Sequence, residues 1–163
     1  MGAIIIQTGG DRDFDPEVLL RAPLMAHLAT TCPEGPRDSP VWFLWEDAAV
    51  WLVGARVDSF VQRLERDPRC ALGIVRFDAD AGVLLHLGIR GRATVGATDA
   101  ARFRRLLAKY LGPDEAGWNP WFIAEIARIE DPDGRMIRVA PDTIVARNLS
   151  FFRTGPEILA CAS

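Results

Sequence analysis

Few side chains in this sequence of 163 residues combine the type and the spacing that catalysis or metal binding requires. The two histidines, His27 and His86, lie within apolar stretches, where a histidine is more often a hydrogen-bonded wall residue than a base or a ligand. The three cysteines, Cys32, Cys70 and Cys161, match neither a zinc pattern nor a redox pattern. The sequence therefore predicts no metal site and identifies no catalytic residue.

Aromatic side chains offer another kind of chemistry, the binding of a planar ligand. Trp42 is placed to stack on a planar cofactor or to form a wall beside it, whereas core packing explains Trp45 and Trp51. Trp118 and Trp121 flank an expected helix start, where covering a cofactor and simple packing are both open readings.

Composition excludes several classes of function. A net charge of -3 and a pI near 5.4 argue against a nucleic-acid-binding protein, which normally carries a basic face. No apolar run approaches the roughly 20 residues of a membrane-spanning helix. Scattered cysteines are typical of a reducing compartment. We therefore expect a cytoplasmic protein that binds neither nucleic acid nor membrane.

The elements that must position these side chains are mostly strands. Apolar stretches bounded by turn residues predict strands over 24–31, 37–45, 48–53, 70–77, 83–95, 136–139 and 143–152. The short connections imply antiparallel hairpins. Helices are expected from Pro16, after Asp58 as N-cap, after Thr98 as cap and from Pro120. We expect one domain over 1–163, with residues 1–12 as a loose arm.

Two details refine this pattern. The strands over 37–45 and 48–53 are apolar on both faces, which indicates a barrel interior on one side and a covering helix or a partner subunit on the other. A homodimer is the economical expectation. Gly88 and Gly91 predict a bulge or bend in the long strand, and Arg102, Arg104 and Arg105 are interpreted as a solvated helix face.

The sequence resembles the flavin-binding split barrels of the pyridoxamine-phosphate-oxidase superfamily over residues 24–150. The resemblance rests on a series of blocks in order: Leu28-Ala29-Thr30-Thr31, Ser39-Pro40-Val41-Trp42-Phe43-Leu44-Trp45, Val50-Trp51-Leu52-Val53, Leu64-Glu65-Arg66-Asp67-Pro68-Arg69-Cys70-Ala71-Leu72, Gly91-Arg92-Ala93-Thr94-Val95 and Val139-Ala140-Pro141-Asp142. It implies a mainly β (α+β) fold, a split β-barrel of antiparallel strands with a few peripheral helices.

The resemblance also implies a homodimer that holds flavin mononucleotide between its subunits, with deazaflavin and heme as the alternatives found in the family. The residues that would lie along the flavin ring are Ser39, Pro40, Val41 and Trp42. Those implied to hold the phosphate are Val53, Gly54, Ala55, Arg56 and Ser59, where a helix start offers free N–H groups. Arg56 and Arg63, or a partner's Arg90 or Arg92, are the cations that could pair with the phosphate.

The sequence departs from the family pattern at two places. Relatives often present a Ser-Arg-Lys-like run at the phosphate, whereas the run here is Asp58-Ser59-Phe60. The Arg-x-His signature of true pyridoxamine-phosphate oxidases is missing from the tail over 148–153. We therefore expect a flavin-dependent oxidoreductase that does not oxidise pyridoxamine phosphate. The alternative is a non-enzymatic split barrel that binds or senses a flavin, heme or deazaflavin.

Overall fold

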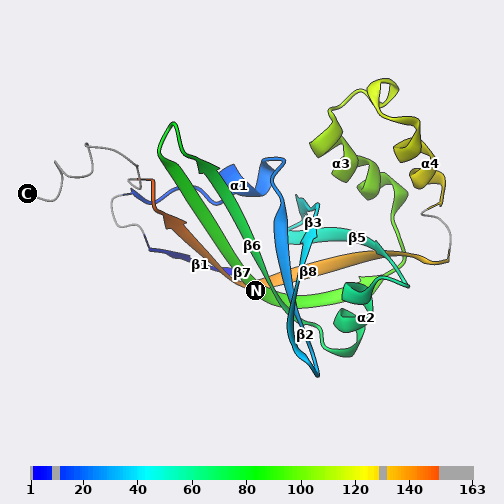
Figure 1. The fold of residues 1–163 in the computed structure, drawn as a ribbon, viewed down its shortest axis with the longest axis horizontal. Helices are drawn as coiled ribbons and strands as arrows, with labels where there is room; N and C mark the ends of the chain where they lie inside the picture. The colour runs from blue at the N-terminus through cyan, green and yellow to red at the C-terminus, as the bar shows by residue number, and fades with distance from the viewer. Residues whose placement is uncertain (1, 9–11, 129–131, 151–163) are drawn as a thin grey trace, which may run out of the picture.

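The computed structural model describes residues 2–8, 12–128 and 132–150 and contains a mostly antiparallel eight-stranded sheet (Figure 1). The strand order is β3-β2-β6-β7-β8-β5-β4, and β1 pairs in parallel with β8. The strands are β1 (Ile4–Gln7), β2 (Ala26–Cys32), β3 (Gly35–Val41), β4 (Leu44–Glu46), β5 (Ala49–Ala55), β6 (Arg69–Asp78), β7 (Val83–Gly96) and β8 (Gly134–Asn148). The helices are α1 (Glu17–Arg21), α2 (Ser59–Arg66), α3 (Ala100–Leu111) and α4 (Pro120–Arg128). The expected β-rich split-barrel fold is confirmed.

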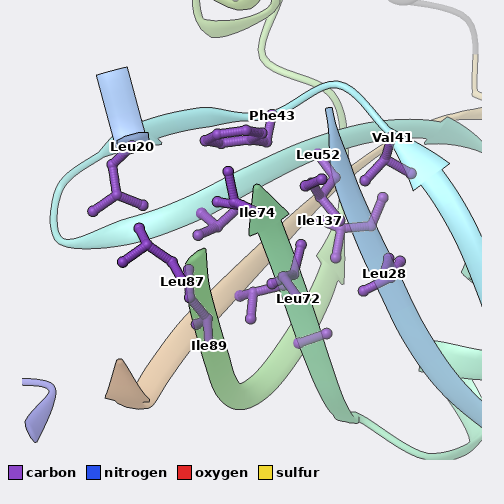
Figure 2. Packing of buried hydrophobic residues seen from close by; sticks show 14 of the residues in the cluster. Leu20, Leu28, Val41, Phe43, Leu52, Leu72, Ile74, Leu87, Ile89 and Ile137 are labelled. Carbon is purple, nitrogen blue, oxygen red and sulfur yellow. The ribbon is translucent and has the colours of Figure 1, made fainter. Parts of the chain in front are cut away.

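Alternate residues of the strands fill the inside of the barrel. Leu72 and Ile74 of β6 and Leu87 and Ile89 of β7 are almost completely buried, as period-two packing requires (Figure 2). Leu20, Leu28, Val41, Phe43, Leu52 and Ile137 complete the labelled part of this core (Figure 2). Burial on this scale, at roughly 25 cal/mol per Å² of apolar surface, supplies the main driving force for folding.

A second apolar layer lies on the other face of β5 and β8. Phe103 and Leu107 of α3 pack with Ile126 of α4 and Met136 of β8, and Val53 of β5 contacts this cluster. Figure 1 shows α3 and α4 together beyond the end of β5. The strand over 48–53 is thus covered on both faces as predicted, and helices of the same chain provide the second cover.

The hairpin from β4 to β5 turns on two residues with positive φ, Asp47 at 54° and Ala48 at 51°. This pair of left-handed conformations matches the twist of a tight hairpin, and it lies at the short connection between the strands expected over 37–45 and 48–53. The bulge expected at Gly91 is also present, because the β7–β8 register shifts between Arg90 and Gly91. A Cβ on Gly91 would lie 2.2 Å from the Ala140 carbonyl oxygen, so only glycine fits.

Several expected boundaries differ from the structure. The strand over 37–45 is broken at residues 42–43, and the two strands expected at the end are one strand, β8. Residues 4–7 form β1 along β8, although 1–12 was expected to be a loose arm. The last two residues of the expected strand over 143–152 lie outside the described residues.

The interpretation of the α3 start and surface is wrong in two respects. Asp99, not Thr98, caps α3 by accepting hydrogen bonds from the Ala101 and Arg102 N–H groups. Arg102 is no freely solvated residue, because its guanidinium pairs with Glu46 at 2.7 Å. Within the described part of the chain, no helix has both the length and the hydropathy needed to cross a bilayer.

Candidate functional site

A cavity of about 610 Å³ lies where β3 and β5 end beneath α3 and α4, a size typical of sites for small molecules. Its walls are mostly apolar, and its few charged groups are Asp58, Glu125, Arg128 and Asp133. The lining residues are Pro40, Val41, Trp42, Val53, Gly54, Ala55, Asp58, Phe60, Phe103, Leu106, Leu107, Trp121, Phe122, Glu125, Arg128, Asp133 and Gly134.

Aromatic rings build one wall of this cavity. Trp42 stacks on Tyr110 with ring centroids 4.5 Å apart and planes 5° from parallel. It also stacks on Phe122 at 5.9 Å, and Phe122 meets Trp121 edge-on at 5.0 Å. Trp121 remains 60% exposed, so the aromatic wall continues to the molecular surface. These contacts hold Trp42 rigidly in the cavity wall.

The break between β3 and β4 orients Trp42, and α3 holds that break in place. The Tyr110 hydroxyl accepts a hydrogen bond from the Phe43 N–H at 3.0 Å and donates one to the Leu24 carbonyl at 2.8 Å. The Lys109 ammonium donates to the Phe43 and Leu20 carbonyls, each at 3.0 Å. Main-chain groups that a continuous strand would pair are therefore satisfied by two neighbouring side chains of α3.

Burial changes the acidity of both side chains. Desolvation raises the pKa of the Tyr110 hydroxyl to about 12, so this group keeps its proton and remains a donor. Desolvation also lowers the pKa of Lys109 to about 7. The Lys109 nitrogen lies 3.3 Å from the centroid of the Phe43 ring, and that ring favours the ammonium form.

At the opposite end of the cavity, Asp58 folds over the end of β5. Its carboxylate accepts a hydrogen bond from the Ala55 N–H at 2.7 Å. A Cβ on Gly54 would lie 2.7 Å from Phe60 Cζ and 3.1 Å from the Asp58 carboxylate, so the absent side chain is what allows this closure. Asp58 occupies the predicted N-cap position of α2, but its side chain bonds back to the strand instead of to the helix.

The arginines near the cavity already have partners. Arg56 Nε lies 2.9 Å from the Asp133 carboxylate, and Arg128 lies 3.0 Å from Glu125. Arg63 donates to the Thr30 hydroxyl at 2.7 Å and to the Ser39 hydroxyl at 3.3 Å. Arg63 faces a separate hollow of about 360 Å³, which it lines with Arg66, Thr31, Cys32, Pro33 and Asp67.

The residues that the sequence singled out therefore fall into groups. Pro40, Val41, Trp42, Val53, Gly54 and Ala55 line the main cavity together. Ser39 and Arg63 are hydrogen-bonded to each other but do not line the cavity. Arg56 does not line it either, but its ion-pair partner Asp133 does. Ser59 opens α2 as an exposed residue, and Arg92 lies on β7 opposite Arg69.

Sequence reasoning missed the contribution of the two helices. Phe103, Leu106 and Leu107 of α3 and Phe122 of α4 line the cavity, although the sequence singled out none of them for a ligand. Glu125 and Arg128 were not singled out. The available signal was the aromatic cluster around residues 118–122, for which a covering role had been left open.

The histidines lie elsewhere. His27 Nδ1 is 2.9 Å from the Asp38 carboxylate, and His86 lines a shallow hollow on the outer face of the sheet. Burial lowers the pKa of His86, and the nearby Arg147 adds to this effect. Within the described ranges, no group of three or more His, Cys, Asp or Glu side chains is placed to share a metal ion.

The order of strands and the peripheral helices define a split β-barrel, a fold that this chain shares with several solved structures. No family model matches the sequence, and no curated protein matches it. Solved structures with this fold include a protein described as an F420 reductase (24% identity, 81% of this chain and 97% of the other, TM-score 0.61). A putative pyridoxamine 5'-phosphate oxidase from Listeria innocua is 16% identical over 82% of this chain and 94% of the other, with a TM-score of 0.57.

A third similar structure is the heme storage protein HutZ from Vibrio cholerae, at 15% identity over 78% of this chain and 89% of the other (TM-score 0.56). At these identities the likeness establishes a shared fold. The three descriptions name different ligands or reactions, so they leave the ligand of this chain to be argued from its own cavity.

Proposed function

We propose that this chain is an oxidoreductase that binds a planar ring of the flavin type in the cavity beneath α3 and α4. The observation that carries the proposal is the aromatic and aliphatic cavity of about 610 Å³, which includes Pro40, Val41 and Trp42. These are residues at which the family resemblance expects the ring to lie. A bound flavin supplies hydride and electron transfer, so the protein need only bind, orient and shield it.

The residues around the cavity suit the ring end of such a ligand. Val53, Phe103 and Leu106 offer apolar contacts that exclude water, and Phe122 offers an aromatic surface near the mouth. The Trp42–Tyr110 stack keeps the wall rigid, which limits the entropy lost on binding. Nothing in this end requires a catalytic acid or base from the protein.

The same cavity does not suit a phosphate. Asp58 occupies the place where the resemblance expects cations, and Arg56 and Arg128 are engaged with Asp133 and Glu125. The proposed function therefore concerns the ring of the flavin and not the phosphate of flavin mononucleotide.

A retention experiment tests the proposal. The purified chain is incubated with riboflavin or with flavin mononucleotide, desalted, and examined by visible absorption. We expect retained flavin bands, lost in Phe122→Ala and kept in Val18→Ala, whose side chain is exposed on α1 and does not line the cavity. A colourless protein with both flavins would overturn the proposal. Reduction of the retained flavin by a nicotinamide donor and reoxidation by an acceptor then tests the enzymatic part.

A second candidate function is storage or sensing of the ring without turnover. The specific observation in its favour concerns Asp58, whose carboxylate accepts the Ala55 N–H. This carboxylate stands where the family resemblance expects a phosphate-binding cation. A bound flavin that no nicotinamide donor reduces would favour this reading. A sharp Soret band after incubation with heme would indicate heme, although neither His27 nor His86 lines the cavity.

We further propose that the chain is a homodimer. Val75 and Phe77 of β6 are 45% and 59% exposed, a large apolar contribution for one surface strand. Light scattering coupled to size-exclusion chromatography checks this, and a mass near the monomer value of 18.0 kDa would contradict it.

A further inference from the structure

The main cavity carries its charge at one end. Its apolar walls come from β3, β5 and α3, whereas Asp58, Glu125 and Asp133 supply carboxylates around residues 54–58 and α4. Such a distribution matters for any ligand whose ring enters the apolar part, because its tail must then pass the acidic groups.

The cations beside this end are committed to neighbouring carboxylates. Arg56 pairs with Asp133 through its side chain, and its N–H also donates to the Asp133 carbonyl at 2.8 Å. Arg128 pairs with Glu125 one helical turn away. Among the ion pairs of the described residues, Asp58 has no cationic partner, so its charge is the uncompensated one at the cavity wall.

Asp58 also stands where the family resemblance expects the phosphate. Its carboxylate already takes the Ala55 N–H, and it stands at the start of α2, where an anion finds its most favourable field. The Phe60 ring closes over Gly54 beside it, with an apolar edge where a basic side chain would be needed. Within the described residues of this chain, a phosphate at this position meets a like charge, and the two arginines at this end, Arg56 and Arg128, are already paired.

We propose that this cavity selects a planar ring ligand whose tail carries no phosphate, such as riboflavin in preference to flavin mononucleotide. The inference rests on the proposed function, since it assumes that the ring occupies the aromatic cavity. It goes beyond that function by naming the chemical class of the ligand and Asp58 as the residue that determines the specificity. In a dielectric close to that of bulk water, a phosphate of nearly two charges about 6 Å from one carboxylate corresponds to roughly a tenfold penalty in affinity.

Affinity measurements on the full chain test this proposal. Dissociation constants of riboflavin and flavin mononucleotide are measured by flavin fluorescence at low salt. We expect riboflavin to bind about tenfold more tightly, and the ratio to shrink as salt screens the charges. Asp58→Asn keeps an oxygen for the Ala55 N–H and removes the charge, so it should bring the two affinities together by improving flavin mononucleotide alone. Unchanged riboflavin binding in this variant shows that the cavity is intact.

Matched variants exclude other causes. Asp78→Asn is the control, because Asp78 likewise accepts a main-chain hydrogen bond, from Ala81 at 2.9 Å, in the β6–β7 turn outside the cavity. It should leave the ratio unchanged. Equal or tighter binding of flavin mononucleotide overturns the proposal. If Arg63→Met abolishes the binding of flavin mononucleotide, the phosphate lies in the hollow beside Ser39 and not beside Asp58. If neither flavin binds, the proposed function fails and this inference fails with it.

Discussion

The indole of Trp42 and the phenol ring of Tyr110 lie 4.5 Å apart and nearly parallel, so that a residue at the end of β3 is held by a residue near the end of α3. The hydroxyl of the same Tyr110 binds the main chain of Phe43, the residue after Trp42, and of Leu24. Tyr110 therefore supports both the cavity wall and the break in the strand, which it shares with Lys109.

Replacing Tyr110 by Phe separates the stack from the hydrogen bonds. The ring remains, but the Phe43 N–H and the Leu24 carbonyl lose a partner in a half-buried place. We expect a loss of about 1–3 kcal/mol in the free energy of unfolding, measured by urea denaturation, with flavin retention preserved at low denaturant. Unchanged stability would mean that water replaces the hydroxyl without cost.

Lys109 is the only lysine in the sequence, so its titration can be followed without overlap from other lysines. We expect a pKa of about 7 for its amino group, because burial disfavours the charge. The unfolded chain binds this proton below about 10.4, so stability should rise with pH from about 7 to 10. Nitrogen-15 NMR of the side chain measures the pKa directly. A midpoint above 9 would show that the two carbonyls and the Phe43 ring outweigh desolvation.

Glu46 links the β4–β5 hairpin to α3 through Arg102 and Arg105. Hydrogen bonds from Arg105 and Arg102 lower the pKa of Glu46 to about 2. A lowered carboxyl pKa gives stability that is present above the unfolded value and lost as pH falls from about 5 to 2. Glu46→Gln should therefore cost about 1–2 kcal/mol at pH 7, after allowing for partial exposure, and little at pH 2. The exposed Glu65→Gln is the control, and equal losses at both pH values would contradict this account.

Gly54→Ala tests the closure at the end of β5. The new methyl would meet Phe60 Cζ at 2.7 Å and Val61 Cγ2 at 2.8 Å, so we expect a loss of about 1–3 kcal/mol in unfolding free energy. Gly96→Ala should cost less, because a Cβ there meets nothing within 4 Å. In a double-mutant cycle, Gly54→Ala should cost less in a Phe60→Ala background than in the parent chain, and an equal cost in both would place the strain at Val61 instead.

Sequence patterns predicted the parts of this fold that depend on local periodicity. Apolar stretches bounded by turn residues located β6 and β7, and the turn at Asp47 follows from two closely spaced strands. The break after Val41 could not be predicted, since its main-chain groups are satisfied by Tyr110 and Lys109, far along the chain. Tertiary partners of this kind leave no trace in the local sequence.

The candidate site shows the same division. The strand residues of the cavity were predicted through family resemblance, because strand order fixes which residues face it. The partners of the arginines were not, because ion pairs such as Arg56–Asp133 join residues 77 positions apart. A charged run read along the sequence therefore says little about which cations remain available to a ligand.

Strand β8 has a consequence for how the chain is made. It pairs with β1, with one edge of β5 and with β7. These pairings cannot form until residues 134–148 have left the ribosome. The register joins Ile4 to Thr143, nearly the whole length of the chain. Such distant pairing slows folding and leaves unpaired strand edges during synthesis. We therefore expect the nascent protein to be most prone to aggregation just before β8 leaves the ribosome.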